Sequence, residues 1–441
     1  MTESKRSTGK TLLLGFQHVF AMFGATVLVP TLTGLSISAT LMFAGLGTLL
    51  FHLITKGKVP AFLGSSFAFL GGYFAVASMD AFTAEGSTLN WIPYAGVGVA
   101  CAGLLYVLVS QLFRVFGAGK VMRFFPPVVT GPIIISIGLT LANSAVDNCS
   151  QNWWIALLAV VIVIAFNIWG KGMLKIIPIL LGVVGSYAVA AIFGKVDFTP
   201  VKQAAWIGLP FQWGDTAFSL IGNCNGSVLL SAIIAMMPIA LATMMEHIGD
   251  MCAISSTVGQ NFIEEPGLHR SLLGDGLATS LAALFGAPAN TTYGENTGVL
   301  ALTKVYDPFV VRLAAIFALL FSFSPKVAAL ISCMPTATIG GVSLILYGMI
   351  SAVGVRNIVE NQVDFTKSRN VIIAALIMSL ALGINFSKAG AIAFSIGSVS
   401  ISLSGLAVAS LVGVILNAVL PGNDYEFGKN NQGDKSVNFK V

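Results

Sequence analysis

Long apolar segments constrain this chain more than any other feature of its sequence. A transmembrane α-helix needs about 20 mainly apolar residues to cross a bilayer, and fourteen segments of the chain meet or approach that length. In the first half they cover residues 12–33, 37–55, 60–78, 93–113, 126–145, 153–170 and 174–194, and in the second half residues 228–250, 272–286, 290–303, 308–324, 337–355, 371–387 and 400–420. Only 9% of the residues are charged, against about 25% in a typical soluble domain. The sequence therefore predicts an all-α polytopic membrane protein.

The basic residues predict how these segments are oriented. If the N-terminus lies inside, only four of the 23 Lys and Arg residues fall in outer loops, namely Lys195, Lys202, Lys326 and Lys388. This strong bias follows the positive-inside rule and predicts a multi-pass protein of the cell inner (plasma) membrane with both termini cytoplasmic. No cleavage site follows a short apolar core, so we expect no removable signal peptide. The inner loops also account for the net charge of +5, so no nucleic-acid partner is expected.

The segments divide into two sets of seven, separated by a polar connection at residues 195–227. Because seven is odd, the second set starts on the opposite side of the membrane, as an inverted repeat requires. A cytoplasmic segment at residues 1–11 precedes the first set, and a polar cytoplasmic tail at residues 421–441 follows the second.

The third and tenth segments resemble each other and are poorly suited to a full crossing. One runs from Pro60 to Phe67 and the other from Pro288 to Glu295, and each combines a Pro, small hydroxylated residues and an aromatic residue. Interrupted segments at matching positions in two halves indicate a transporter's binding site. Packing kinks are an equally good explanation, because Gly and Pro are common in membrane helices.

Three of the acidic residues inside or beside predicted spans are candidates for a functional site. An ionisable side chain within a span costs about 2.5–3.5 kcal/mol on insertion scales. Glu246 and Asp250 are four residues apart, hence on one helix face, and Glu295 stands between Gly294 and Asn296. Asp250 also fits an inner membrane boundary, where an acid needs no functional explanation. Glu246 and Glu295 are best explained as protonated, paired or substrate-bound groups.

The remaining ionisable residues in the spans favour structural interpretations. Asp275 is expected to be a helix cap or an interfacial group, and His52 an interfacial residue close to Lys56. His18 and His247 are better explained as hydrogen-bond partners between helices than as proton carriers.

If the third and tenth segments are broken at mid-membrane, their freed backbone N–H groups must face a cavity, because lipid would not satisfy them. Carboxylates accept hydrogen bonds, whereas the N–H groups of Phe67 and Gly294 donate them, and Phe67 and Tyr293 supply flat apolar contacts. Such an array suits a small neutral heterocycle with alternating N–H and C=O groups. A buried carboxyl group is also a natural proton carrier. We find no Walker A loop, GxSxG, HExxH or clustered metal ligands, so we expect no ATP, cofactor, metal or enzymatic activity.

Several motifs make the chain resemble the nucleobase/ascorbate transporter family, and most closely its bacterial uracil permease branch. The family signature is matched in full by Glu295-Asn296-Thr297-Gly298, followed by Thr303-Lys304. The other motifs are Gln17-His18, AMFGATVLVP at 21–30, PAFLGSSFAF at 60–69, EHIG at 246–249, GLHRS at 267–271 and NTTYGEN at 290–296. The resemblance covers residues 17 to about 420.

This resemblance implies fourteen transmembrane helices in two inverted repeats, with short antiparallel β-strands in the third and tenth segments. It implies a core domain formed by residues 12–113 and 228–324, and a gate domain formed by residues 114–194 and 325–420. Substrate is expected between the two strands, and a homodimer through the gate domains is an associated expectation. The substrate-binding residues implied are Glu246, Glu295, Phe67, Gly294, Tyr293, Tyr347 and Ala25.

The function expected from the resemblance is proton-coupled import of uracil by alternating access, with the lipid bilayer and protons as the other partners. The candidate proton-coupling residues are Glu295, Glu246, Asp250 and His247. Asp250 departs from the best-known uracil carriers, which have a His at this position. The alternatives are the same mechanism for xanthine, urate or thymine, or an anion carrier or channel on the same scaffold. By resemblance, the motif Thr-Thr-Tyr293-Gly294-Glu295 favours a pyrimidine as the substrate.

Overall fold

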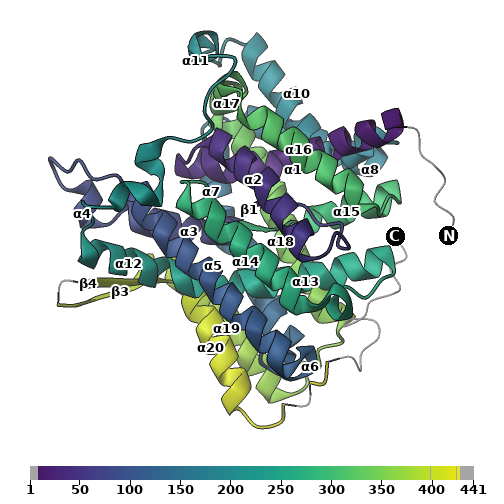
Figure 1. The fold of residues 1–441 in the computed structure, drawn as a ribbon, viewed down its shortest axis with the longest axis vertical. Helices are drawn as coiled ribbons and strands as arrows, with labels where there is room; N and C mark the ends of the chain where they lie inside the picture. The colour runs from purple at the N-terminus through teal and green to yellow at the C-terminus, as the bar shows by residue number, and fades with distance from the viewer. Residues whose placement is uncertain (1–7, 398, 424, 428–441) are drawn as a thin grey trace.

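The computed structural model of the chain describes residues 8–397, 399–423 and 425–427. Residues 1–7 of the predicted N-terminal segment and residues 428–441 of the predicted tail lie outside this part. The described chain is predominantly helical, with two small two-stranded sheets (Figure 1). Most of the predicted apolar segments coincide with helices, which confirms a polytopic α-helical architecture.

The described residues of the first half of the chain form eleven α-helices and one strand. They are α1 (Thr8–Thr33), α2 (Ile37–Ile54), β1 (Leu63–Ser65), α3 (Leu70–Ala77), α4 (Asp80–Thr83), α5 (Trp91–Phe116), α6 (Ala118–Val121), α7 (Pro127–Ser150), α8 (Trp153–Trp169), α9 (Met173–Ile176), α10 (Pro178–Ile192) and α11 (Thr199–Gln203). A 3₁₀ turn at Phe67–Phe69 leads into α3, so the third predicted segment is a strand followed by a helix.

The second half also begins with helices and contains three strands among its described residues. Its elements are α12 (Gly226–Met236), α13 (Ala240–Val258), α14 (Leu268–Leu284), β2 (Asn290–Thr292), α15 (Gly294–Thr303), α16 (Pro308–Ser322), α17 (Pro325–Ser332), α18 (Thr336–Glu360), α19 (Ser368–Asn385), β3 (Ala391–Ile396), β4 (Val399–Ser404) and α20 (Gly405–Val419). A turn containing Pro238 joins α12 to α13. The tenth predicted segment is again a strand followed by a helix, as the family resemblance implied.

Not every predicted span is a full-length helix. By length and apolar composition, six of the described helical segments could cross a membrane, or seven if α16 and α17, bent by 88°, count as one. Phe67–Ala77, Trp153–Trp169, Pro178–Ile192 and Gly405–Val419 are shorter apolar helices. The number of fourteen spans therefore stays a prediction.

The last predicted segment was wrong at its start. Residues 400–404 belong to β4, which pairs with β3 in an antiparallel hairpin, and the helix begins only at Gly405. The reason is visible in the sequence, where apolar Ile392, Phe394 and Ile396 alternate with small residues. This period of two favours a strand over a helix.

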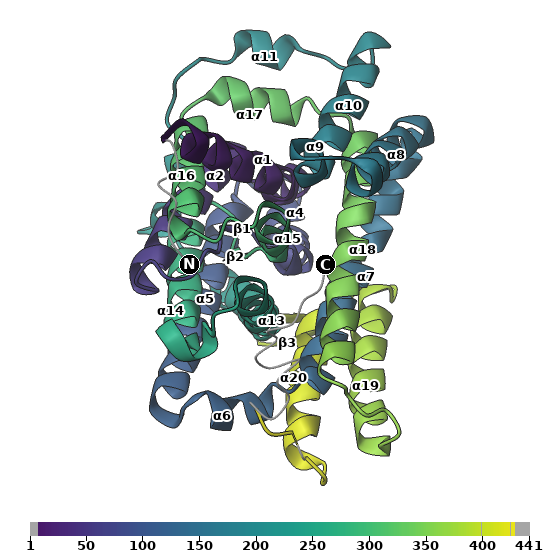
Figure 2. The ribbon, with the colours of Figure 1, turned by 90° about the vertical axis from the view of Figure 1, so that its right-hand side faces the viewer.

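The long helices form two groups that face each other (Figure 2). In one group α14 packs against α5 and α2, and α16 packs against α2 and α1. In the other, α18 packs against α7 and α8, α19 against α7 and α20, and α10 against α8. Figure 2 shows the strands β1 and β2 with α13 and α15 beside the space between the groups.

Glycine allows the central helices of each group to approach closely. A Cβ added to Gly138 of α7 would lie 2.1 Å from the backbone oxygen of Tyr347 in α18. On the other side, a Cβ added to Gly103 of α5 would lie 2.5 Å from the backbone oxygen of Gly276 in α14. Small residues at such crossings are the usual means of packing helices within a membrane.

Candidate functional site

The site is built around the pairing of two short strands that are far apart in the sequence. β1 and β2 are antiparallel, with Leu63 opposite Thr292 and Ser65 opposite Asn290. The ladder is extended at both ends, because the N–H of Ser66 donates to Ala289 O at 2.8 Å and the N–H of Tyr293 donates to Phe62 O at 3.1 Å.

Side chains from neighbouring helices form hydrogen bonds with backbone N–H and C=O groups on the outer edges of these strands. The N–H of Leu63 donates to the hydroxyl of Thr48 in α2 at 2.9 Å, and the Thr279 hydroxyl of α14 donates to Asn290 O at 2.6 Å. The Asn290 amide in turn donates to Phe43 O in α2 at 2.8 Å. Non-helical backbone inside a membrane protein requires such partners or a cavity, and these contacts hold the pair of strands in place.

Each strand leads directly into a helix whose first N–H groups have no intrahelical acceptor. Phe67 is the first residue of the 3₁₀ turn before α3, and Gly294 is the first residue of α15. Helix N-termini carry partial positive charge. Phe67 and Gly294 both line one cavity.

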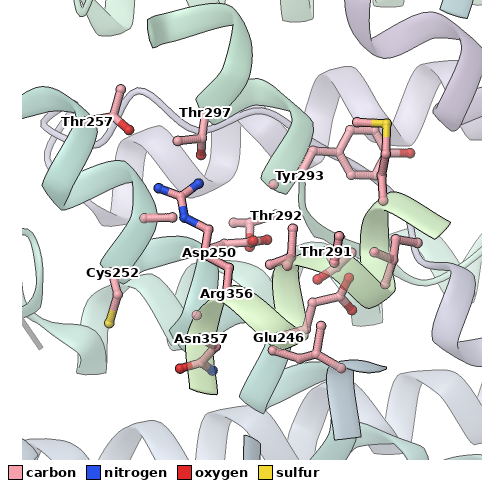
Figure 3. Close-up of a pocket in the computed structure, with 18 of the residues that line it drawn as sticks. Glu246, Asp250, Cys252, Thr257, Thr291, Thr292, Tyr293, Thr297, Arg356 and Asn357 are labelled. Atoms are coloured by element: carbon pink, nitrogen blue, oxygen red, sulfur yellow. The ribbon is translucent and has the colours of Figure 1, made fainter. Parts of the chain in front are cut away.

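This cavity has a volume of about 740 Å³, within the range of roughly 300–1,000 Å³ usual for small-molecule sites. Its walls come from both helix groups, with residues of α13, β2 and α15 on one side and of α7 and α18 on the other. Figure 3 shows Glu246, Thr291 and Tyr293 gathered on the first wall, with Arg356 and Asn357 of α18 across from them.

One end of the cavity lies at segments that the sequence places inside the cell. The residues there are Met122, Phe125, Lys175, Thr257, Glu360, Asn361 and Tyr425. The described residues of the predicted outer loops contribute nothing to the lining.

Glu246 and Asp250 lie on one face of α13 and both line the cavity. Asp250 is 4% exposed and accepts a hydrogen bond from the Thr292 hydroxyl at 3.3 Å. It also lies against the start of α15, because a Cβ added to Gly294 would be 2.8 Å from Asp250 Oδ1. Asp250 therefore belongs to the cavity wall at the level of the strands, which favours a site residue over the boundary alternative.

Glu295 is the second residue of α15. Its side chain lies outside the part of the chain that the structure describes, so its role stays a prediction.

Tyr293, one of the two predicted aromatic contacts, packs against β1. Tyr293 lines the cavity, and its hydroxyl lies 3.2 Å from both the backbone oxygen and the hydroxyl of Ser65. Its ring crosses directly over Gly64, where an added Cβ would be 2.5 Å from the ring. Only glycine leaves room for the ring in this position.

Tyr347 and Ala25 support the cavity from behind and are not among the residues that line it. The Tyr347 ring meets the Phe67 ring edge to face, with centroids 5.5 Å apart. Ala25 in α1 is 1% exposed, and its backbone oxygen lies 3.3 Å from the Ser65 hydroxyl. Both residues adjoin groups of the site, although neither reaches the cavity surface as the resemblance suggested for Tyr347.

The structural interpretations of Asp275 and His52 were wrong. Both side chains are buried, at 0% and 2% exposure. Asp275 Oδ2 lies 3.2 Å from Nδ1 of His247, behind β2, and His52 Nε2 lies 2.9 Å from Ala61 O. Their positions near helix ends suggested an interface, and no local pattern in the sequence indicates that neighbouring elements cover them.

Sequence reasoning also missed polar groups in the cavity wall. The hydroxyls of Thr291 and Thr297 are buried, line the cavity and have no hydrogen-bond partner among the described residues. Arg356 and Asn357 of α18 reach the cavity from the other group of helices. Threonine is common in membrane helices for structural reasons, so its presence alone gave no signal.

Known transporters match most of this chain in sequence. Residues 9–390 match the family model Xan_ur_permease, described as "Permease family". The chain belongs to this family of nucleobase/ascorbate transporters. It is 42% identical over 419 residues to the uracil permease of Bacillus subtilis (strain 168), covering 92% of this chain and 91% of that protein. It is 41% identical over 429 residues to the uracil permease of Bacillus caldolyticus, covering 95% and 94%.

Solved structures support the fold alone. The transmembrane domain of the cyanobacterial bicarbonate transporter BicA aligns with a TM-score of 0.62 at 16% identity, covering 94% of this chain and 98% of that one. Family membership makes the chain a multi-pass membrane transporter and not an enzyme.

Proposed function

We propose that this permease imports uracil together with protons by alternating access. The observation that carries the proposal is the convergence of two helix N-termini, at Phe67 and Gly294, with the Glu246 carboxyl group in one cavity. The relatives that match nine-tenths of the chain at about 40% identity are uracil permeases, which supports the choice of substrate.

The proposed contacts follow from the donors and acceptors present. Uracil presents ring N–H groups and C=O groups along its edge. The backbone N–H groups of Phe67 and Gly294 donate to the ring C=O groups, and the Glu246 carboxylate accepts from a ring N–H. Hydrogen bonds to charged groups contribute about 1.5–3 kcal/mol each. Tyr293 packs on the face of the ring, and Glu295 is proposed as a second carboxyl contact by resemblance.

A carboxyl group in this cavity also gives a reason for proton coupling. Moving an ionised carboxylate between water and a closed site is unfavourable. A proton taken up from outside neutralises Glu246 or Glu295, and the neutral loaded carrier then changes conformation. The proton and uracil thus favour the same state, which is the thermodynamic requirement for coupling.

The inverted repeat belongs to this proposal, and the packing of the helices supports it. Exchanging the two halves would make α2 equivalent to α14 and α7 equivalent to α18, and each of these pairs is in contact. The same exchange makes α5 on α14 equivalent to α16 on α2, and α8 with α10 equivalent to α19 with α20. Each of these helix contacts therefore has an equivalent contact after the exchange.

We further propose that the two helix groups are the core (residues 12–113 and 228–324) and the gate (residues 114–194 and 325–420). Rocking of one group against the other would expose the cavity to each side in turn. In the predicted orientation, the cavity end at Lys175 and Glu360 supports an inward-facing state. The positive-inside bias supports the proposal that both termini are cytoplasmic and that the protein lies in the inner (plasma) membrane. A homodimer through the gate is proposed on the resemblance alone.

Transport of another nucleobase is the nearest alternative. The likeness of fold to a bicarbonate transporter does not favour an anion, because Glu246 and Asp250 line the cavity and carboxylates repel anionic substrates.

The proposal is tested by uptake of labelled uracil into proteoliposomes, with and without an inward proton gradient. We expect concentrative uptake only with the gradient, and competition by excess unlabelled uracil but not by xanthine. Accumulation without a gradient would reject symport, and preference for xanthine would reject the pyrimidine assignment.

A further inference from the structure

The β3–β4 hairpin connects the two helix groups. In the chain it lies between α19 and α20, which pack together in the group that contains α7 and α18. Its strand β4 nevertheless packs against α12 and α3, which adjoin α5 in the other group. Figure 1 shows both strands beside α12. The hairpin therefore belongs to one group by its place in the chain and contacts the other group through β4.

The root of the hairpin is fixed to its own group. Gly405 follows β4 directly and is the first residue of α20. A Cβ added to Gly405 would lie 2.4 Å from the backbone oxygen of Ala381 in α19, so the two helices are in close backbone contact there. If α19 and α20 move relative to α12, the hairpin must therefore leave α12 or bend.

The hairpin is docked on α12 by one edge of β4. The N–H of Ser400 donates to the hydroxyl oxygen of Ser231 in α12 at 3.0 Å, so this N–H is directed toward α12 and away from Ser395, its partner in β3. Ser231 is 3% exposed, and its hydroxyl donates in turn to Ser227 O at 2.9 Å. Strand β3 is mostly exposed, whereas β4 is half-buried. This contact through a single edge can separate while the pairing of β3 with β4 stays intact.

The hairpin and the mouth of the large cavity lie on opposite sides in the predicted orientation. Lys388, in a predicted outer loop, stands between the end of α19 and the start of β3. Helix α12 begins where the predicted outer connection 195–227 ends. The cavity end at Lys175 and Glu360, by contrast, belongs to predicted inner segments.

A second, small cavity lies between the substrate site and the hairpin. Its volume is about 30 Å³, which is enough for about one water molecule. It is lined by Gly71 of α3 from one group, and by Thr140 of α7 and Ser404 of β4 from the other. Phe67 lines both the small and the large cavity. Uracil does not fit in the small space, so the two groups must separate here before substrate reaches the site from outside.

We propose that the β3–β4 hairpin is an outer latch. Docking of β4 on α12 and α3 holds the outer side closed while the cavity is open to the inside, and undocking accompanies opening to the outside. The contact between Ser400 and Ser231 is then present in one state and absent in the other, so it favours the inward-facing state. The latch rests on the proposed division into core and gate and on their relative movement.

Reversible cross-linking tests the latch. In the full-length protein, the five native cysteines are replaced by serine, and Ser231→Cys is combined with Ser400→Cys. A short bifunctional methanethiosulfonate bridges the two thiols, dithiothreitol removes the bridge, and mass spectrometry confirms it. Bridging should lower uracil uptake into proteoliposomes by about tenfold or more, and dithiothreitol should restore uptake to within about twofold.

The matched control combines Ser395→Cys with Ser400→Cys. These residues are directly opposite each other in the hairpin, so a bridge between them leaves the hairpin free to move away from α12. Uptake by this control should change by less than about twofold on bridging.

Thiol labelling follows the same movement without a bridge and serves if the paired variant does not fold. A membrane-impermeant maleimide is added from outside to cells that contain Ser231→Cys or, as the control, Ala232→Cys. Ala232 is 0% exposed, and its backbone oxygen faces Gly98 of α5 within the same helix group. Ser231→Cys should react at least about tenfold faster than Ala232→Cys, because only Ser231 is uncovered when the hairpin undocks.

Failure of the latch and failure of the proposed function give different results. If neither the wild type nor the cysteine-free parent takes up uracil, the proposed function fails, and the labelling rates still report whether the hairpin undocks. If the parent transports and the bridged Ser231–Ser400 variant transports as well as the control pair, the latch is overturned. Equally slow labelling of Ser231→Cys and Ala232→Cys in a transporting protein also overturns it.

Discussion

Replacing Gly64 by Ala tests whether the geometry of the paired strands supports the site. Gly64 lies in the middle of β1, opposite Thr291. A Cβ at this position would be 2.5 Å from both Cζ and the hydroxyl oxygen of Tyr293, a distance that carbon atoms cannot tolerate. The ring must therefore swing away from β1, and its hydroxyl must leave the Ser65 oxygen atoms, each 3.2 Å away.

The size of the effect follows from two contributions. Overpacking a well-packed site costs about 1–3 kcal/mol, and the lost hydrogen bonding to Ser65 costs about 0.5–1.5 kcal/mol. The total of about 1.5–4.5 kcal/mol corresponds to roughly a 10- to 2,000-fold loss of affinity if it falls entirely on binding. To the extent that the strands separate, this free-energy cost lowers the stability of the protein instead of its affinity. Both the affinity and the stability therefore need to be measured.

The assay is uracil binding to the purified protein by calorimetry, combined with thermal unfolding in detergent. Gly71→Ala is the matched control, because Gly71 follows the same strand in α3 and an added Cβ meets nothing within 4 Å. In the double variant Gly64→Ala, Tyr293→Ala the clash is absent, so thermal stability should recover relative to Gly64→Ala. If Gly64→Ala matches Gly71→Ala in both affinity and stability, the described position of the Tyr293 ring is wrong.

Two further predictions concern the acid and the helix packing. Glu246→Gln replaces a charged acceptor in the cavity, so uracil uptake should fall by about 10- to 150-fold at equal protein levels, and wild-type uptake would remove Glu246 from the site. Gly138→Val places a side chain against a backbone oxygen of α18 only 2.1 Å from the first added carbon, and backbone cannot yield there. We expect about 3 kcal/mol or more of destabilisation, seen as loss of folded protein in size-exclusion chromatography. Gly348→Ala on α18, where an added Cβ meets nothing within 4 Å, should remain folded, and equal behaviour of the two variants would contradict the described packing.

The sequence alone determined the environment of the chain and the position of its interruptions. Hydropathy is a sum over neighbouring residues, so apolar segments are readable without any tertiary contact. The third and tenth segments were identified as broken because Pro60 and Pro288 precede small hydroxylated residues, and β1 and β2 are found there. Glu246 stood out because an acid inside a span is unfavourable by itself. The period-two alternation of Ile392, Phe394 and Ile396 was also present in the sequence, in the connection before the last predicted segment, and was overlooked.

Only the tertiary structure decided which of these groups meet. Ser65 and Asn290 are more than 200 residues apart in the chain, yet they are opposite each other in one ladder. Asp275 looked like a helix cap until α13 and β2 were seen to cover it beside His247. Burial and hydrogen-bond partners depend on which elements pack against each other. A local sequence pattern contains no information about the element that packs against it. The cavity between the two helix groups, lined by Arg356 of α18 and by Thr291 and Thr292 of β2, exists for the same reason only in the folded protein.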